Sequence, residues 1–360
     1  MRSNGREALK RIAKGVIHTR QRHIYHTGHA RKARSVLEVV EGDQGRTHAR
    51  QLQACNEYAV DVLGWSGYAP WLYVYTAVSG KFIEGWIPDN YYGEVVLPAL
   101  NGEHGRVSSL KSITNQIFRS PCIPDIAMLA NGLIVTPNGA IIDHASLREF
   151  LFSDDDRVVF KRDGSGQGLG VVVLSASDFA YEAVARLGNG VMQRYVHQHP
   201  TLAALCAASV ATIRITTASD DAGIISVRAA YLRLGVGHDT HVKSASSVRV
   251  PLDLVTGGLQ ERGYLANWRS VVAHPDSGVA FAGVVLPSFR ACLDVVVGLH
   301  MAVPYVRCIG WDVTVDAQGE IAVLEWNGDH NDIKFSEAVS GPCFSDLGWE
   351  RLWRTGRSWH

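Results

Sequence analysis

The pattern of apolar and polar residues changes character along this chain of 360 residues. Up to about residue 62, Ala, Leu, Arg and Glu mix in proportions that favour helices. Residues 64–98 combine many aromatic side chains with glycines and prolines, which predicts turns and short extended pieces. Residues 107–121 then predict a capped helix that ends at Pro121.

Strand-like patterns dominate the remainder. Residues 123–143 predict strands with turns at Gly132 and Asn138-Gly139, followed by a short helix near 145–151. From residue 191 onward the runs lengthen and become β-branched, in MQRYV, SVATIRITTA, GIISVRAAYLRLG and SVRVPLDLVTG, which indicates an antiparallel sheet. Residues 287–302 predict a further helix. This mixture predicts an α+β protein with more than one lobe.

A glycine-rich hairpin is predicted at residues 158–174, VVFKRDGSGQGLGVVVL. Two β-branched runs flank alternating glycines, and Lys161 ends the first run. Such a loop can point successive N–H groups inward around phosphate oxygens, to which a lysine adds a positive charge. Because a strand follows the glycines, the motif is not a Rossmann fingerprint, and it lacks the Gly-Lys-Ser/Thr of a Walker A loop. Its glycines are Gly164, Gly166, Gly168 and Gly170.

A second predicted hairpin, near the C-terminal end, carries three oxygen-bearing side chains. GWDVTV and EIAVLEW read as strands joined by a turn at residues 316–319. If residues 316 and 321 pair, Asp312 lies opposite Glu325, and Glu325 shares a face with Asn327. Hard oxygen ligands of this kind suit Mg²⁺, which usually shares its shell with substrate phosphates.

Each pattern by itself also fits a simpler structure. A glycine hairpin can be no more than a turn, and isolated acids commonly line a solvated hairpin face. Their presence in one chain favours a site for phosphate groups with magnesium. Arg214 supports this interpretation, because an arginine within a β-branched strand that is expected to be buried needs an anionic partner.

Composition and charge exclude some classes of partner. Lys and Arg together number 35, as do Asp and Glu, so no overall field attracts nucleic acid or membrane. The first 35 residues hold ten Lys or Arg against Glu7, which fits either contact with an acidic surface or, as we favour, a solvated basic helix. Six scattered cysteines without a C-x-x-C pair suggest buried thiols in a reducing compartment. No apolar run approaches ~20 residues, so a cytoplasmic protein is predicted.

The order of these motifs resembles the ATP-grasp superfamily, and within it the sugar-transfer associated branch. The resemblance spans about residues 107–332 and rests on LKSITNQIFRSPCIP, VVFKRDGSGQGLGVVV, MQRYVHQHP, SVATIRI, GWDVTV and VLEWNGD. It implies the ATP-grasp fold, in which two α+β lobes hold ATP between them. The expected divisions are an N-terminal helical and aromatic-rich subdomain, a lobe with the glycine loop, a lobe with the metal site and a tail, at 1–106, 107–190, 191–345 and 346–360.

The resemblance also implies roles for individual residues. Lys111 and Lys161 would contact the nucleotide phosphates, and Arg214 would be the phosphate-directed arginine. The glycine loop, including Ser165, would cover the nucleotide. Residues 193–196 would form the hinge strand against adenine, with Gln193 at its start. The backbone of Tyr195 and Val196 would read the base, although ordinary core packing explains that strand equally well. The Mg²⁺ ligands would be Asp312, Glu325 and Asn327.

The activity implied is an ATP-dependent ligase that joins a carboxylate to an amine or similar nucleophile through an acyl phosphate. Its substrates would belong to cell-surface polysaccharide or peptide-like metabolite biosynthesis. A small-molecule or sugar kinase on the same fold and a noncatalytic ATP-binding partner protein remain alternatives.

Two departures from the family pattern leave the substrate class open. Arg162-Asp163 stands where a proline is common, and residues 240–257 lack a common Gly-Gly pair. Arg233 is the first candidate for holding an acidic substrate, ahead of Arg228, Lys243 and Arg249.

Overall fold

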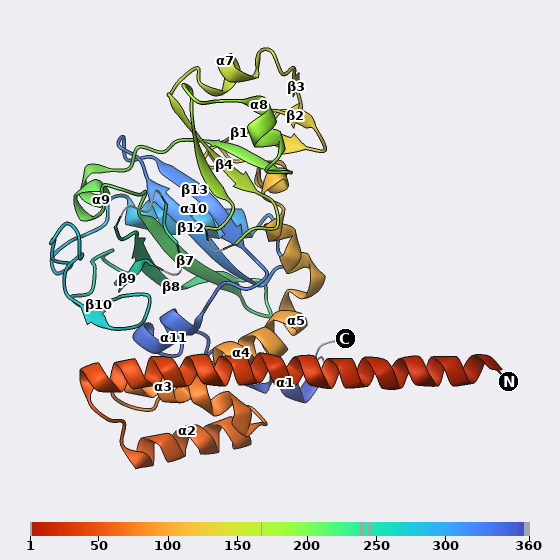
Figure 1. The fold of residues 1–360 in the computed structure, drawn as a ribbon. Coiled ribbons are helices and arrows are strands. Elements are labelled where there is room, and N and C mark those ends of the chain that lie inside the picture. Colours follow the sequence, from red (N-terminus) through yellow and green to blue (C-terminus); the bar gives the residue numbers. More distant parts are fainter. Residues whose placement is uncertain (1, 167, 238–240, 244–245, 356–360) are drawn as a thin grey trace. The chain divides into compact units, whose positions relative to one another are not determined.

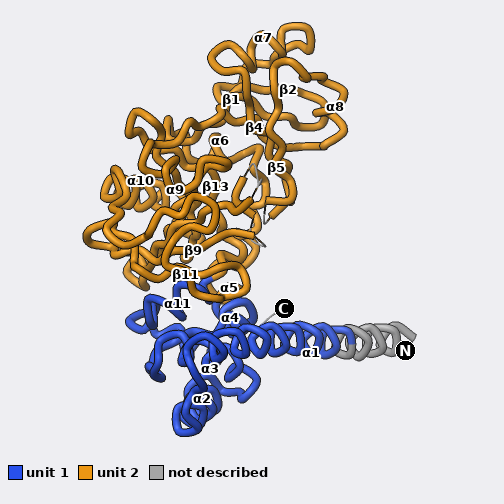
Figure 2. Tube along the Cα trace, turned by 60° about the vertical axis from the view of Figure 1, so that its left-hand side comes forward, with its two compact units in different colours: residues 1–96, 333–360 blue, residues 97–332 orange. Residues whose placement is uncertain are grey.

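The computed structural model describes residues 2–166, 168–237, 241–243 and 246–355, with side chains from residue 17 onward. The chain divides into two compact units, one of residues 1–96 with 333–360 and one of residues 97–332 (Figure 2). The domain boundaries expected from the sequence stay predictions. Within the described residues, no helix combines the length and the apolar character needed to cross a membrane.

The first unit is helical. Its elements are α1 (Arg2–Gln44), α2 (Ala49–Asp61), the 3-10 turn η1 (Ser66–Tyr68), α3 (Ala69–Ser79), α4 (Asp89–Tyr91), the π-helical turn η2 (Tyr92–Val96), α11 (Lys334–Ser340) and the 3-10 turn η5 (Trp349–Thr355). The helices predicted up to residue 62 are confirmed. The extended pieces predicted for residues 64–98 are wrong, because this segment is also mostly helical.

The error over residues 64–98 has a physical cause. In α3, Trp71, Leu72, Val74 and Tyr75 are all buried, although they point to different sides of the helix. A helix that buries most of its circumference shows no 3.6-residue period, so its aromatic and β-branched residues suggested strands instead. Pro70 stands in the first turn of α3, where its missing N–H costs nothing.

The second unit contains two sheets (Figure 1). The first sheet has six strands in the order β3-β2-β1-β6-β4-β5, and every pairing in it is antiparallel. Phe160, Met192 and Leu129 on one face form a core with residues of α7 and α8. The elements are β1 (Asp125–Ala130), β2 (Leu133–Val135), β3 (Ile141–Ile142), α7 (Leu147–Leu151), β4 (Arg157–Arg162), β5 (Val171–Ser175), α8 (Tyr181–Ala185) and β6 (Gly190–Arg194). The strands predicted in 123–143 and the helix near 145–151 are confirmed.

The second sheet has seven antiparallel strands in the order β11-β10-β9-β8-β7-β12-β13. Ile213, Leu232 and Val313 on one face pack with α10, in a core that also holds Trp311 and Trp326. The elements are α9 (Pro200–Leu205), β7 (Thr212–Ser219), β8 (Ile225–Leu234), β9 (Val248–Pro251), β10 (Gly263–Tyr264), β11 (Ser270–Val271), α10 (Phe289–His300), β12 (Cys308–Val315) and β13 (Ile321–Asn327). The antiparallel sheet and the helix within 287–302 are confirmed.

One strand belongs to a different sheet from the one expected. The sequence pattern grouped MQRYV with the later strands, but β6 pairs with β1 and β4 in the first sheet. The grouping is wrong because the composition of a strand indicates that it pairs within a sheet but does not indicate which strand it pairs with.

The helix predicted for residues 107–121 is broken. After α5 (Leu97–Leu100), the segment forms the 3-10 turns η3 (Gly102–Ser109) and η4 (Lys111–Ile113), followed by the short helix α6 (Thr114–Phe118). Leu110, with φ −89° and ψ 80°, separates the two 3-10 turns. The Ser109 carbonyl accepts a hydrogen bond from the Gly164 N–H (2.8 Å) in the glycine-rich loop. This segment is therefore not a continuous helix, and it contacts the glycine-rich loop instead.

Candidate functional site

The glycine-rich segment is a hairpin, as predicted. β4 and β5 pair in register, with Lys161 opposite Val171. Gly164 (φ 65°) and Gly168 (φ 84°) occupy the left-handed region that favours glycine. At Gly170, a Cβ atom would lie 2.1 Å from Oγ of Ser165, whereas at Gly166 it would meet nothing within 4 Å. Three of the four predicted glycines are therefore required by the loop's conformation.

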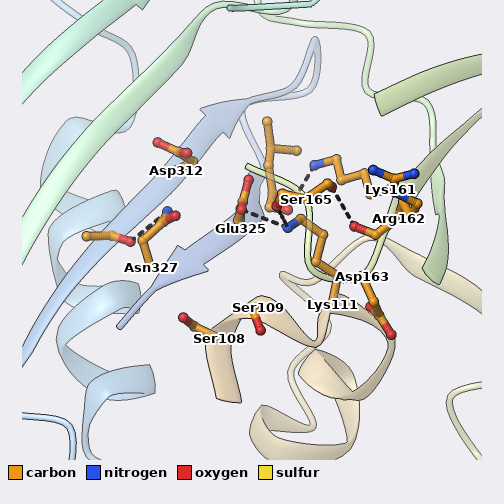
Figure 3. A network of polar contacts seen from close by, with 12 residues as sticks. Ser108, Ser109, Lys111, Lys161, Arg162, Asp163, Ser165, Asp312, Glu325 and Asn327 are labelled. Atoms are coloured by element: carbon orange, nitrogen blue, oxygen red, sulfur yellow. Dashed lines mark hydrogen bonds and ion pairs between the residues drawn. The ribbon is translucent and has the colours of Figure 1, made fainter. Parts of the chain in front are cut away.

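Lys111 joins this loop to the second sheet. Its Nζ donates to the Ser165 carbonyl (2.6 Å) and lies 3.2 Å from Oε1 of Glu325 (Figure 3). Asp163 fixes the start of the same segment, because its carboxylate accepts from the backbone N–H (2.9 Å) and the hydroxyl (2.6 Å) of Ser112. Asp163 thus holds the turn that carries Lys111 against the loop.

The second hairpin places its acids as predicted, although not by the expected register. Asp312 pairs with Glu325, but at the turn Val315 pairs with Ile321, whereas residues 316 and 321 were expected to pair. A β-bulge lies between these two points, because Asp312 pairs with Glu325 while the adjacent Val313 pairs with Val323. Leu324 is therefore the extra residue, and it restores the pairing of the two acids.

The bulge also supplies a hydrogen-bond acceptor. The Leu324 carbonyl accepts from Nζ of Lys161 (2.9 Å) and, more weakly, from Nε2 of Gln193 (3.3 Å). Lys161 is buried, and burial lowers its pKa, although Glu325, Asp125 and Asp312 oppose that shift. Two polar side chains of the first sheet thus converge on one backbone atom of the β12–β13 hairpin.

Asp125 on β1 completes this polar group and was not anticipated from the sequence. Its Oδ1 accepts from Nε2 of Gln193 (2.8 Å). Burial raises the pKa of Asp125 to about 6, although the bond from Gln193 and the charge of Lys161 oppose the shift. A single acid at the beginning of a predicted strand gave no signal that it would lie beside Gln193.

Arg214 has the anionic partner that its position in a buried strand required. Nε and Nη2 of its guanidinium donate to Oδ1 (2.7 Å) and Oδ2 (2.9 Å) of Asp312, and Nη1 donates to the Asn331 carbonyl (3.0 Å). Burial alone would raise the pKa of Asp312, but Arg214 and Arg233 hold it below its ordinary value. Such bidentate pairs are both stronger and more directional than single ion pairs.

The oxygen donors of β12 and β13 can be tested for their fit to Mg²⁺. Glu325 is 24% exposed, and Asn327 turns its Nδ2 to the Gly310 carbonyl (3.3 Å), which leaves Oδ1 as the ligand atom. Both oxygens of Asp312 already accept from Arg214. Within the described residues, no set of three His, Cys, Asp or Glu side chains is placed to hold a metal. The donors fit a magnesium ion that takes the rest of its shell from phosphate oxygens and water, with Glu325 and Asn327 as the better-placed ligands.

Some of the predicted site residues do not reach the other site residues with their side chains. Val196 is buried, and the ring of Tyr195 lies 3.9 Å beneath the guanidinium of Arg157. Only their backbone groups could serve a nucleotide base, as the resemblance implied. Arg233 lies at the edge of the site, with Nη1 3.6 Å from Oδ2 of Asp312. In the stretch 240–257, residues 240, 244 and 245 lie outside the described part of the chain.

Residues 180–346 match the family described as "Sugar-transfer associated ATP-grasp". A comparison with curated proteins found no significant match.

Among solved structures, biotin carboxylase from Campylobacter jejuni is 13% identical, with a TM-score of 0.43 over 70% of this chain and 46% of that one. The D-alanine–D-alanine ligase of Coxiella burnetii is 10% identical, with a TM-score of 0.38 over 73% and 69% of the two chains. The ATP-grasp ligase PsnB, bound to its minimal precursor, is 16% identical, with a TM-score of 0.38 over 70% and 64%.

This chain spans less than half of the length of the biotin carboxylase. The family match and the motif order agree over the second sheet and its hairpin. The second unit is an α+β structure with two antiparallel sheets, as predicted, and residues 180–346, a little under half of the chain, are similar to the sugar-transfer associated ATP-grasp family.

Proposed function

We propose that this protein is an ATP-dependent ligase that joins a carboxylate to an amine or similar nucleophile. The observation that carries the proposal is that Lys111 and Lys161 both contact the β12–β13 hairpin beside the glycine loop (Figure 3). Cations on one side and oxygen ligands on the other are what a magnesium-bound triphosphate requires. The family that residues 180–346 match supports ATP as the nucleotide.

In the proposed reaction, an oxygen of the substrate carboxylate attacks the γ-phosphorus of ATP, and the bond to the leaving ADP breaks. The nucleophile then attacks the acyl carbon of the resulting acyl phosphate, releases inorganic phosphate and loses a proton. The protein's task is to align these groups and to neutralise charge on the phosphoryl oxygens. Bound magnesium would supply part of that neutralisation, with Glu325 and Asn327 as its ligands.

The charged side chains have distinct tasks in this scheme. Lys161 is buried and already hydrogen-bonded to the hairpin, so it can present a fixed charge to the phosphates. Lys111 would exchange Glu325 for a phosphate oxygen, which releases the Glu325 carboxylate for the metal. Arg214 holds Asp312 on the same face and adds positive charge beside the site.

We further propose that the substrates belong to cell-surface polysaccharide or peptide-like metabolite biosynthesis. The support is the family's description as sugar-transfer associated. A cytoplasmic location is part of the same proposal, as expected from the sequence.

Product analysis tests the reaction. The full chain is incubated with Mg-ATP and a pool of carboxylates and amines, and ADP, phosphate and coupled product are followed by chromatography and mass spectrometry. The proposal expects ADP and phosphate only when a particular acid and nucleophile are both present. A stable phosphorylated product with no new amide or ester would identify a kinase instead, and ADP release that needs no carboxylate would refute the ligase.

A further inference from the structure

A pocket of about 710 Å³ lies in the second unit, outside the group of residues proposed to hold the nucleotide. Its wall is formed by α6 and the segment that follows it, the start of β1, the turn between β2 and β3, and the end of β6. Lys111, Lys161 and Glu325 do not line it. Its volume falls within the range that is typical of sites for small molecules.

Two arginines line this pocket without a carboxylate partner. Arg119 and Arg194 are both exposed, and within the described part of the chain neither side chain makes a hydrogen bond, an ion pair or a ring contact. Asp125 is the only acid among the described residues of the lining. Burial raises the pKa of Asp125, and the charge that opposes this shift comes from Lys161 and not from either arginine. Both guanidinium groups are therefore available to a phosphate or carboxylate of a ligand.

The backbone of each arginine is fixed in the wall of the pocket. Arg119 ends α6 with φ 47°, in the left-handed region, and its N–H donates to the Asn115 carbonyl (2.7 Å). Glycine commonly takes this position, whereas a residue with a Cβ atom adopts the conformation at a cost of roughly 1 kcal/mol. The Arg194 N–H donates to the carbonyl of Pro124, another residue of the lining (2.8 Å). A ligand would therefore meet two cations whose main chains are already ordered, which lowers the entropic cost of binding.

Other polar groups of the wall suit hydroxyl groups. Asp125 is 7% exposed, and its Oδ2 has no hydrogen-bond partner among the described residues, whereas Oδ1 accepts from Gln193. The side-chain amide of Asn115 also makes no hydrogen bond to a described residue. An unpaired carboxylate oxygen needs a donor, and an amide can both donate and accept, so hydroxyl groups fit both. Between these polar groups, Pro124 and Ile126 provide apolar surface for the carbon atoms of a ligand.

We propose that this pocket binds a small molecule that carries hydroxyl groups and one oxyanion, either a phosphate or a carboxylate. Arg119 and Arg194 bind the oxyanion, and Oδ2 of Asp125 accepts from a hydroxyl group. A sugar phosphate and a sugar acid both have this chemistry. The inference does not depend on the proposed ATP-dependent function, because the residues assigned to the phosphates and the metal do not line the pocket.

Titration of the full chain with simple compounds of this class tests the pocket. Glycerol 3-phosphate and glycerate are titrated by calorimetry at constant ionic strength, and glycerol is the uncharged control. We expect saturable binding of at least one of the two anions and at least about tenfold weaker binding of glycerol, which lacks the contacts with the arginines. The anion that binds more tightly distinguishes a phosphate site from a carboxylate site. Saturation with Mg-AMP-PNP should not displace the anion.

Replacement of both arginines identifies the pocket as the place where the anion binds. Arg119→Met together with Arg194→Met should weaken the affinity at least about tenfold, on the scale of a lost charged contact. Arg290→Met is the matched control, because Arg290 is 81% exposed on α10 and does not line the pocket, so its variant should bind as the unmodified chain does. Circular dichroism establishes that each variant is folded. Arg194→Met alone, expected to weaken binding at least about threefold, replaces the double variant if that variant does not fold.

Three results would overturn the inference. One is that neither anion binds to the unmodified chain, and another is that the folded double variant binds the anion with unchanged affinity. The third is displacement of the anion by Mg-AMP-PNP, which would locate it at the proposed nucleotide site. If AMP-PNP itself does not bind, the proposed ATP-dependent function fails, whereas the double variant still decides whether the pocket binds the anion.

Discussion

Glu325 is the residue on which the proposed chemistry depends most directly, and its replacement separates function from folding. Glu325→Gln keeps the shape of the side chain and removes one negative charge from the proposed metal site. Glu325 is partly exposed but its partner Lys111 is buried and keeps the Ser165 carbonyl as an acceptor, so the unfolding free energy should fall by about 1–3 kcal/mol without loss of the fold. Turnover with Mg-ATP should fall on the order of 100-fold. A urea denaturation curve alongside the ADP assay checks both, and loss of the fold would make Glu325 a structural residue.

The Arg214–Asp312 pair couples stability to the site. Both side chains are buried, so Arg214→Met leaves Asp312 without its bidentate partner and should cost about 3–5 kcal/mol of unfolding free energy. The double variant Arg214→Met with Asp312→Leu removes both charges and should regain most of that stability without regaining activity. Chemical denaturation of the two variants measures this. If the single and the double variant were equally stable, the stability lost in Arg214→Met would not come from an unpaired Asp312.

At the scale of an element, the glycine loop offers a matched pair of substitutions. Gly170→Ala would force a Cβ atom to within 2.1 Å of Oγ of Ser165, whereas Gly166→Ala meets nothing within 4 Å. Gly170→Ala should therefore distort the loop and weaken binding of an ATP analogue about tenfold or more, the loss expected when about 1.4 kcal/mol of phosphate contacts is removed. Gly166→Ala should bind normally. Calorimetric titration of both variants checks this, and equal affinities would mean that the loop does not hold the nucleotide.

The elements also show which structural features could be predicted from the sequence. The pairing of Asp312 with Glu325 was predicted from the two strand patterns, although the register used for it is off by one residue at the turn and the bulge compensates for that difference. The bulge at Leu324 was not, because nothing in a period of two marks an extra residue. That bulge provides the carbonyl that accepts from Lys161 and Gln193. A central contact of the site therefore could not be predicted from the alternation of apolar and polar residues. The helical segment within 64–98 was missed for the opposite reason, since complete burial removes the helical period.

Within the helical unit, stability should depend on pH through Glu337. This carboxyl is fully buried, and burial raises its pKa to about 8, although backbone N–H groups of Ile87 (2.6 Å) and Cys343 (2.7 Å) donate to it. Its pKa is about 4.5 in the unfolded state and about 8 in the folded state. At pH values between these two, the folded state binds one proton more than the unfolded state. Unfolding free energy should therefore fall as pH rises through that window.

Comparison with Glu337→Gln isolates this contribution. The amide cannot ionise, so the part of the pH dependence that belongs to residue 337 should disappear, even if the variant is less stable because it has lost one acceptor oxygen. Urea denaturation at several pH values between 5 and 8 measures the difference. Parallel pH profiles for the two proteins would show that Glu337 does not titrate in this window.

For the whole molecule, we propose that the second unit binds ATP with magnesium at the glycine loop and the β12–β13 hairpin. This binding is measured by calorimetric titration of the full chain with AMP-PNP, with and without Mg²⁺. We expect one site per chain, tighter binding with Mg²⁺ than without it, and loss of the Mg²⁺ effect in Glu325→Gln. If AMP-PNP does not bind under either condition, or if its affinity is the same with and without Mg²⁺ and in Glu325→Gln, the proposed site is wrong.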